Sequence, residues 1–441
     1  MMRPTRFAAL VLLFLPAVLT AQFHVDTLTV NRWRFPLTDY GPFGQGASWR
    51  VSSHQYLFGC GPWFGAVVGN DTLVSVGYNP NSGMSELRTG DSRGDSLSMV
   101  YIWPDRWPPP QSRFPHAPQV RRSDQDAWCC FNDFDYASHV PPGRPLPVQV
   151  YLTAYAWRSP RAQDLVILQY EFECLSESTL STACYAAVAL DPDVGDAADD
   201  MYGVIYHRWL HRSPSDSFYV DNVAYAYDAD NSEPWDSVGY VGVALIKTPR
   251  SLGATAIKKF TIDIDPETDG QQYLTMAGYD YRTGIYCPID SVDIAPGDKR
   301  FLVATGPFTL GYPGPSIETL VVVIGASTRW PDLTGIGEIG IIGDSLYRYG
   351  VPGVAAETRL TTPPASLKAW PNPFGSVVWF TTVDPTTTGR IEIRDVCGRL
   401  VRTIAPGERC MWRGDDARGR QVPAGVYCVI VGGERLKVVR R

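Results

Sequence analysis

Apolar and polar side chains alternate along much of this chain, which is the pattern of β-strands that bury one face. In residues 168–174 (LQYEFEC), Leu, Tyr, Phe and Cys alternate with Gln and Glu. Turn-forming pairs such as Gly-Asp and Asn-Asp separate this run from similar ones. Further strands are predicted at residues 72–78, 97–103, 148–157, 184–190, 218–227, 240–247, 256–264, 300–304 and 319–324. Short strands joined by tight turns predict an all-β fold, a large antiparallel β-sandwich body at residues 22–350, in one or two subdomains.

Two stretches of the body depart from the strand pattern. Residues 335–349 carry a weak helical pattern and are the one helix that the sequence indicates. Residues 103–118 (WPDRWPPPQSRFPHAP) are rich in proline, which cannot donate a hydrogen bond to a β-ladder. We therefore expect this segment to run over the surface as a loop.

A second, smaller all-β unit is predicted at residues 367–441. It is preceded by residues 351–366, which lack alternation and contain three prolines, the composition of a semi-extended linker. Strands of the small unit are predicted at residues 377–383, 389–395, 399–404, 426–431 and 435–439.

Several short motifs follow one another in this C-terminal unit. Their positions are Pro371, Asn372, Pro373, Phe374, Asp395, Gly398, Gly419, Gly425 and Tyr427. With these motifs the unit resembles the type A C-terminal sorting domain of the type IX secretion system, which is similar in fold to the immunoglobulin-like domain of the flagellar hook-capping family. The resemblance implies export by an outer-membrane secretion machinery, removal of the tail in many members and attachment to surface lipopolysaccharide. An accessory immunoglobulin-like module without a sorting role is the alternative.

The physical chemistry of these motifs agrees with a small sandwich. Pro371 and Pro373 fix the backbone at the start of the first strand, and Phe374 is expected to close the end of the sandwich. Gly398 and Gly425 are expected in hairpin turns, where a positive φ favours glycine.

The first 21 residues have the pattern of a signal peptide. Arg3 and Arg6 precede an apolar run at residues 8–19, which is too short for a membrane span of about 20 residues. Ala21 offers a small residue for cleavage, which would leave Gln22 at the mature start. We expect a secreted or cell-surface protein that passes through the periplasm.

Composition and charge exclude several classes of protein. With 44% hydrophobic, 12% aromatic and 19% charged residues, the chain is neither disordered nor a coiled coil nor a polytopic membrane protein. Residues 22–366 carry 24 Lys and Arg against 39 Asp and Glu, whereas residues 367–441 carry thirteen against seven. An acidic body has no electrostatic means of holding a phosphate backbone, so nucleic acid is not an expected partner.

Nine cysteines are present, and an odd number leaves at least one thiol unpaired. Cys174 and Cys184 flank a short polar segment between two predicted strands, so a bridge across a hairpin and buried free thiols are both compatible with this spacing. The neighbours Cys129 and Cys130 must face opposite sides of any strand. No Cys-x-x-Cys motif supports a zinc or redox site.

Two kinds of short motif resemble catalytic sites, but each lacks residues that the chemistry requires. Gly-Asp-Ser-Leu occurs at residues 94–97 and 343–346, as in the nucleophile block of one esterase family, but no histidine follows Ser345 and none has Asp three residues before it. His207 and His211 have the spacing of zinc ligands on a helix, yet their segment reads as a strand and lacks the glutamate base of a zinc protease.

An acidic loop at residues 191–200 is the densest polar cluster. Its candidate calcium ligands are Asp191, Asp193, Asp196, Asp199 and Asp200. Carboxylates this close repel one another unless water or a cation separates them, and Ca²⁺ takes six to eight oxygen ligands. The loop is not an EF-hand, because residue 202 is Tyr where that motif has Glu. A second acidic turn at residues 228–233 has similar chemistry, and solvated turns without an ion are the alternative.

Two functional classes follow from these features. The sequence favours an exported, non-enzymatic protein with a structural, adhesive or matrix role at the cell surface. The alternative is a secreted carbohydrate-binding or glycan-degrading protein, because 13 Trp and 23 Tyr offer rings that stack on sugars. No catalytic residue is predicted, and a structural Ca²⁺ is the one candidate cofactor.

Overall fold

The computed structural model describes residues 23–50, 54–93, 98–139, 143–175, 181–230, 238–311, 314–350, 368–381, 391–395, 399–404, 411–431 and 434–441. The chain divides into two compact units, Met1–Ala356 and Glu357–Arg441. The division falls in the segment 351–366 that we interpret as a linker. That segment lies outside the described residues, as do residues 1–21.

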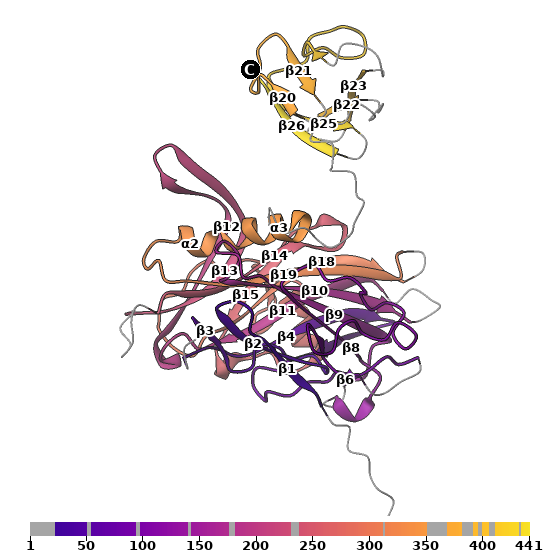
Figure 1. Ribbon diagram of the computed structural model, residues 1–441, viewed down its shortest axis with the longest axis vertical. Coiled ribbons are helices and arrows are strands. Elements are labelled where there is room, and N and C mark those ends of the chain that lie inside the picture. Colours follow the sequence, from indigo (N-terminus) through magenta and orange to yellow (C-terminus); the bar gives the residue numbers. More distant parts are fainter. Residues whose placement is uncertain are drawn as a thin grey trace, which may run out of the picture. The chain divides into compact units, whose positions relative to one another are not determined.

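The body consists of two large antiparallel sheets (Figure 1). Sheet A has the order β1 (Val25–Leu28), β2 (Trp33–Thr38), β3 (Ala47–Trp49), β4 (Gln55–Val68), β11 (Ser181–Pro192), β18 (Arg300–Leu310) and β15 (Ala256–Phe260), with β5 (Asp71–Val76) paired to β4. Sheet B has the order β12 (Asp200–Ser213), β13 (Asp216–Asp228), β14 (Tyr240–Lys247), β19 (Ile317–Ser327), β10 (Leu165–Cys174), β9 (Val148–Ala156), β8 (Gln125–Asn132) and β6 (Arg88–Thr89), with β7 (Tyr101–Ile102) paired to β8. The predicted all-β fold is confirmed.

The main core lies between the two sheets. Phe64 of β4 stacks on Phe172 of β10 with ring centroids 5.0 Å apart, so the inner faces of sheets A and B are in direct contact. Leu168, Tyr170 and Phe172 all belong to this core, as the alternation of their segment predicts. Side chains on opposite inner faces of packed sheets interdigitate in this way in β-sandwiches.

The outer faces of both sheets are also covered, by elements that the body supplies from its loops. Helices α2 (Thr334–Gly337) and α3 (Ile339–Tyr349) cover one part of sheet B, and Phe114 of the proline-rich loop packs on Trp128 over another part. Helix α1 (Asp269–Met276) covers sheet A through Met276. Strands buried on both faces read as continuous apolar runs rather than as alternation.

Expectations for local structure hold in most places and fail in a few. The helix predicted at residues 335–349 is present as α2 and α3, whereas α1 was not expected. The strand predicted at 256–264 ends at Phe260 and is followed by a 3-10 helix, Ile262–Ile264. The segment between Cys174 and Cys184 is not a hairpin within one sheet, because β10 belongs to sheet B and β11 to sheet A.

Several cysteines fill the core as free thiols. Cys129 faces the core between the sheets, and its neighbour Cys130 faces the layer under the proline-rich loop. Burial raises the pKa of Cys130 to about 12 and that of Cys129 well above its ordinary value. Neither thiol therefore ionises near neutral pH, and both act as small apolar side chains.

The C-terminal unit contains two small antiparallel sheets. One has the order β20 (Lys368–Trp370), β21 (Val378–Thr381) and β24 (Met411–Trp412), and the other has the order β23 (Leu400–Ile404), β22 (Ile391–Asp395), β25 (Gly425–Val431) and β26 (Glu434–Arg440). Phe374, Trp412 and Tyr427 are buried together in its core. Each sheet has one face against this core, which is the arrangement expected of a small sandwich.

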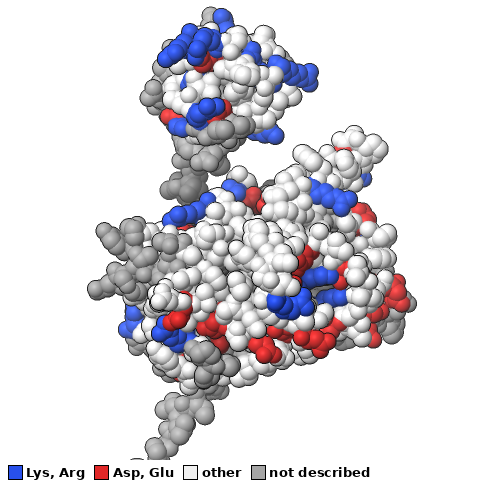
Figure 2. Space-filling model, turned by 180° about the vertical axis from the view of Figure 1, so that it is seen from behind, with Lys and Arg blue, Asp and Glu red and all other residues white. Residues whose placement is uncertain are grey.

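Charged side chains are distributed differently on the two units. On the face shown in Figure 2, Asp and Glu are spread over the body between separate groups of Lys and Arg, whereas Lys and Arg prevail on the C-terminal unit. This distribution follows the uneven charge along the sequence.

Candidate metal centre

The β12–β13 hairpin brings the two acidic segments of the body together at its base. Asp200 opens β12 and lies directly opposite Asp228, which ends β13. Directly opposite residues in an antiparallel pair present their side chains to the same face. Asp199 precedes Asp200, at the end of a 3-10 helix (Ala197–Asp199), and Asp230 lies two residues beyond Asp228.

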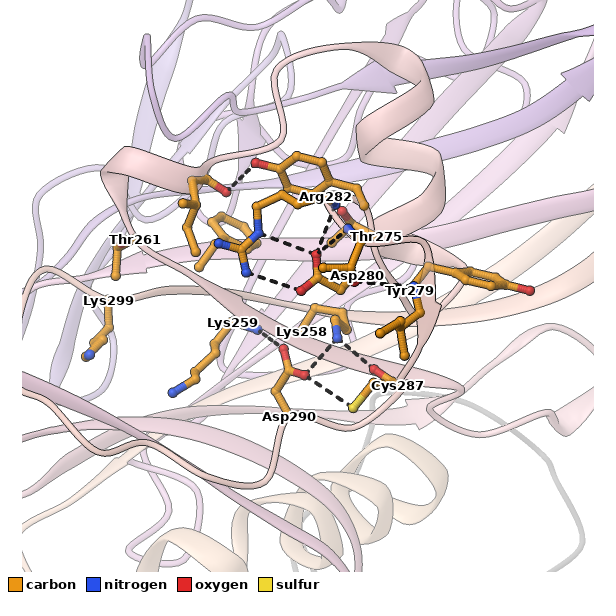
Figure 3. A pocket seen from close by; sticks show the side chains of 15 residues that line it. Lys258, Lys259, Thr261, Thr275, Tyr279, Asp280, Arg282, Cys287, Asp290 and Lys299 are labelled. Atoms are coloured by element: carbon orange, nitrogen blue, oxygen red, sulfur yellow. Dashed lines mark hydrogen bonds and ion pairs between the residues drawn. The ribbon is translucent and has the colours of Figure 1, made fainter.

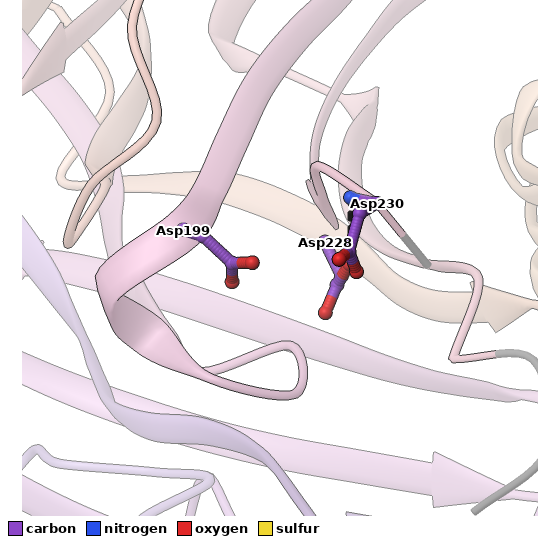
Figure 4. A group of neighbouring side chains, drawn as sticks. All are labelled: Asp199, Asp228 and Asp230. Atoms are coloured by element: carbon purple, nitrogen blue, oxygen red, sulfur yellow. Dashed lines mark hydrogen bonds between the residues drawn. The ribbon is translucent and has the colours of Figure 1, made fainter. Parts of the chain in front are cut away.

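Three carboxylates at this base form one group. Oxygens of Asp199, Asp228 and Asp230 all lie within 4.8 Å of one another. In Figure 4, Asp199 points across a gap toward the other two side chains. The backbone holds the group together, because the amide of Asp230 donates to Asp228 Oδ1 at 2.9 Å and the amide of Ala229 donates to the carbonyl of Asp199 at 3.2 Å. This spacing allows one cation to contact all three residues.

A fourth carboxylate borders the group and is fully buried. Asp200 is 0% exposed, and its Oδ2 accepts from the amide of Val194 at 3.2 Å. Its Oδ1 and the Oδ1 of Asp199 are buried without a hydrogen-bond partner among the described residues. Native proteins rarely leave buried polar atoms unpaired, so these two oxygens point to a missing partner at this place.

The electrostatics of the group indicate which partner is missing. Burial, together with the charges of Asp193, Asp228 and Asp199, raises the pKa of Asp200 to about 9 against the opposing effect of the Val194 amide. Burial, Asp230 and Asp196 raise the pKa of Asp199. Both shifts show that negative charge is disfavoured here in the absence of a counterion. A cation would remove the repulsion.

The remaining predicted ligands lie elsewhere. Asp191 is buried in an ion pair with Arg300, 3.1 Å from Oδ1 to Nε, and accepts a hydrogen bond from the Tyr78 hydroxyl at 2.9 Å. Asp193 accepts from Gln55, and Asp196 caps the 3-10 helix by accepting from the amide of Ala198 at 3.0 Å. Of the five predicted ligands, the structure therefore places only Asp199 in the group and Asp200 beside it.

Asp228 and Asp230 come from the second acidic turn. Each acidic segment can be recognised in the sequence by its cluster of aspartates. The two segments lie side by side only because of the register of β12 on β13, which the sequence does not reveal. The resulting group offers oxygen ligands only, which suits hard cations such as Ca²⁺ and Mg²⁺.

A buried histidine that the sequence did not single out lies in a second polar cluster. His139 Nε2 is 2.7 Å from Asp133 Oδ1, and its Nδ1 is 3.6 Å from Glu86 Oε1. Burial acts to lower the pKa of His139, but the bond to Asp133 and the charges of Asp133 and Glu86 outweigh it and raise the pKa. The Ser75 hydroxyl donates to Asp133 rather than to the imidazole, so this cluster lacks the serine–histidine contact of a hydrolase.

The two Gly-Asp-Ser-Leu strings and the pair His207 and His211 do not form a catalytic site among the described residues. Ser345 is exposed on α3, and Asp344 beside it pairs with Arg348. Ser96 lies outside the described residues. His207 and His211 are in β12, as expected of a strand, where residues four apart are separated by roughly 13 Å.

The residues that carry the resemblance of the tail lie mostly around its last strand. The Asn372 side chain donates to the carbonyl of Lys437 at 2.8 Å and accepts from the amide of Val439 at 2.9 Å. Phe374 is 1% exposed and the Tyr427 hydroxyl donates to the carbonyl of Pro423 at 2.7 Å. The remaining motif positions are Pro371 and Pro373 beside Asn372, Asp395 paired with Arg399, and Gly419 at a φ of 76°.

Two glycines of the tail, Gly398 and Gly425, were expected in hairpin turns. Gly425 begins β25 and is not among the glycines at positive φ, so the expectation of a hairpin turn there is wrong. Gly398 lies outside the described residues.

Comparisons with known proteins assign no family. No family model and no curated protein matches the chain. Among solved structures, the chain is similar to an Aspergillus nidulans amine oxidase, with 7% identity and a TM-score of 0.33 over 76% of this chain and 57% of that one. It is also similar to a putative aldose 1-epimerase from Escherichia coli K12, with 11% identity and a TM-score of 0.34 over 70% of this chain and 100% of that one. Neither likeness supports an argument about function.

In the described part of the chain, no helix is both long and apolar enough to cross a membrane.

Proposed function

We propose that this protein is an exported cell-surface or extracellular protein with a non-enzymatic role, structural or adhesive, whose body binds a structural Ca²⁺ at the Asp199–Asp228–Asp230 group. The observation that carries the calcium part of the proposal is the acidic base of the β12–β13 hairpin, where two buried oxygens have no hydrogen-bond partner among the described residues. A structural ion joins segments that the chain leaves apart, and this group joins both acidic segments.

Calcium fits the location and the ligands better than the other hard cation. Ca²⁺ accepts irregular sets of carboxylate, carbonyl and water oxygens, whereas Mg²⁺ demands near-octahedral geometry. Extracellular calcium modules work at dissociation constants of about 10⁻⁴–10⁻³ M, which a partly exposed group of three carboxylates can reach. Asp228 is buried and Asp230 is exposed, so an ion bound here keeps access to solvent.

Export is the part of the proposal that rests on the two ends of the chain. The signal-peptide pattern at residues 1–21 and the sorting-domain resemblance at residues 367–441 together imply delivery through the outer membrane, with the secretion machinery and lipopolysaccharide as partners. The ties of Asn372 to the last strand and the burial of Phe374 support the resemblance, since they give physical roles to its motif residues.

A localisation experiment tests the exported role. The full chain is compared with a chain lacking residues 367–441, and residues 367–441 are also fused to a periplasmic reporter. We expect the full chain and the fusion to be accessible to protease on intact cells and the truncated chain to stay in the periplasm. Surface delivery of the truncated chain, or retention of the fusion, would contradict the sorting role.

Carbohydrate binding is a second candidate function, and one surface favours it. Trp209 is 59% exposed and Tyr219 is 40% exposed, and they face each other across the β12–β13 hairpin, which projects from the body (Figure 1). The planes of the two rings make an angle of 62° and their centroids are 5.6 Å apart, so the rings form an edge-to-face pair rather than a flat platform. Exposed aromatic rings of this kind stack on apolar faces of ligands.

A glycan array on the full chain distinguishes this candidate. If the hairpin binds sugar, Trp209→Ala should abolish the signal. Tyr136→Ala is the matched control, because Tyr136 is 73% exposed on a different part of the body. An array without signal, or a signal that both variants weaken equally, would remove the hairpin as a glycan site.

A further inference from the structure

A hollow of about 590 Å³ lies where sheets A and B end, beside helices α2 and α3. Its walls come from the start of β2, the end of β3, the turn before β10 and the segment after β19. Four arginines from these four places line it, namely Arg32, Arg50, Arg161 and Arg329. The volume is typical of pockets that hold small molecules, which run from about 300 to 1,000 Å³.

Carboxylates in this hollow compensate only part of its positive charge. Arg32 pairs with Asp164 at 3.2 Å, and Asp164 also accepts from the indole nitrogen of Trp49 at 2.9 Å. The other lining carboxylate, Glu338, is already paired with Arg212 from outside the hollow, at 2.7 Å. Asp332 lies near Arg329 but accepts both hydrogen bonds from Thr334, at 2.8 and 2.7 Å.

Three guanidinium groups are therefore not paired with a carboxylate among the described residues, although that of Arg329 donates to the Thr334 hydroxyl at 3.5 Å. Arg50, Arg161 and Arg329 are exposed and form no ion pair within the part of the chain that the structure describes. Arg50 lies at a φ of 64°, in the left-handed region that side chains other than glycine rarely adopt, and its guanidinium is 5.8 Å from the centre of the Trp49 ring. Strained backbone of this kind is often found at binding sites.

In a second cationic pocket of the body, each cation is paired with a carboxylate. The pocket in Figure 3, of about 470 Å³, is lined by Lys258, Lys259, Lys299 and Arg282. Lys258 pairs with Asp290 at 2.7 Å, Lys259 and Lys299 pair with Asp293 at 2.6 and 3.2 Å, and Arg282 pairs with Asp280 at 3.2 Å. In the arginine hollow only Arg32 has a partner of this kind among the described residues, although acidic residues outnumber basic ones by 39 to 24 over residues 22–366.

We propose that the arginine hollow binds a compact oxyanion, which is a sulfate, phosphate or carboxylate group, free or carried by a small organic molecule. Guanidinium groups hold such anions through paired, charge-assisted hydrogen bonds, and their planar shape matches the anion's oxygens. Like charges that line one hollow, here Arg50, Arg161 and Arg329, repel one another without a ligand, and an anion between them converts that repulsion into attraction. This site is distinct from the acidic group at the hairpin base, which attracts the opposite charge.

Calorimetric titration of the full chain tests the proposal. The probes are sodium sulfate, sodium phosphate and glucose 6-sulfate, each added at constant ionic strength held by sodium chloride. We expect saturable binding at one site, weakened about tenfold or more in the double variant Arg161→Gln/Arg329→Gln, which removes two charge-assisted contacts. Tighter binding of glucose 6-sulfate than of sulfate would assign the group to an organic ligand, and equal binding would assign it to the free anion.

Two further variants protect the test from simple misfolding. Arg208→Gln removes one of the two charges that the double variant loses, at an exposed position of β12 outside the hollow, and it should leave binding unchanged. Arg161→Lys/Arg329→Lys keeps the charge but loses the paired geometry, so its affinity should fall between the wild type and the glutamine variant. Absence of saturable binding in the wild type, or equal weakening by Arg208→Gln, would overturn the proposal.

Discussion

Calcium should stabilise the body through the Asp199–Asp228–Asp230 group, and Asp199→Asn should remove most of that stabilisation. Asp199 is half-buried and supplies one ligand from outside the β13 turn, so the substitution removes the ligand that the first acidic segment gives to the group. A ligand that binds only the native state stabilises it by about 1–2.3 kcal/mol at 5 mM when its dissociation constant is about 10⁻⁴–10⁻³ M. Since one kcal/mol moves the Tm of a domain of this size by roughly 2 °C, we expect a rise of about 2–5 °C.

The pH dependence of stability supplies a second signature of the same group. Asp200 has a pKa of about 9 in the folded chain, whereas an unfolded aspartate titrates near 3.9. Between these values the native state holds a proton that the unfolded state has lost, so rising pH destabilises the protein by about 1.4 kcal/mol per pH unit for this group. Glu86 and Asp191, each with a pKa raised by burial to about 7, act in the same direction. Without calcium, stability should therefore fall from pH 5 to pH 8.

The assay is thermal unfolding of the full chain, followed by circular dichroism at several pH values, in EDTA and in 5 mM CaCl₂. Calcium should raise the Tm and flatten its fall with pH, because the ion takes the place of protons on the carboxylates. Asp196→Asn is the matched control, since Asp196 lies outside the group and Asn also caps a helix. A wild-type Tm that calcium does not change, or an equal calcium shift in Asp199→Asn, would refute the reasoning.

Three other predictions test separate parts of the structure. Arg300→Ala should cost about 3–5 kcal/mol in urea unfolding, because it strands the buried carboxylates of Asp191 and Asp265, while Arg282→Ala, at an exposed pair, should cost less than about 1 kcal/mol. The full chain should not hydrolyse short nitrophenyl esters, and an esterase activity that Ser345→Ala abolished would contradict this. In the tail, Asn372→Ala should lower the stability of the C-terminal unit by roughly 1–2 kcal/mol, seen as faster proteolysis there, whereas Arg413→Gln should not.

Alternation predicted β10, which has one polar face, but it missed β4, whose two faces are buried, although the equally buried β9 was predicted. Residues 168–174 gave β10 because Gln169, Glu171 and Glu173 are only partly buried. Strand β4 was missed because residues 56–66 of this strand, with the exception of Phe58, are buried, and because its glycines resemble turns. A Cβ at Gly59 or Gly61 would come within 2.5 Å of Tyr78, so these glycines make room for that side chain instead.

The candidate sites show a second limit of sequence reasoning, which is distance along the chain. Asp199 and Asp228 were both noted as acidic positions, but only the register of β12 on β13 places them together. The arginine hollow left no signal, because its arginines come from four segments that share no motif. The charged segments themselves could be recognised in the sequence, whereas which of them lie side by side depends on the tertiary structure.

Equilibrium dialysis against ⁴⁵Ca²⁺ tests the central claim most directly, because it counts ions rather than their effects. The full chain should bind one calcium ion at millimolar calcium. The double variant Asp199→Asn/Asp230→Asn should bind none, and Asp196→Asn should still bind one. A wild-type chain that binds no calcium, or a double variant that retains its ion, would contradict the account of this protein as one stabilised by calcium at the base of its hairpin.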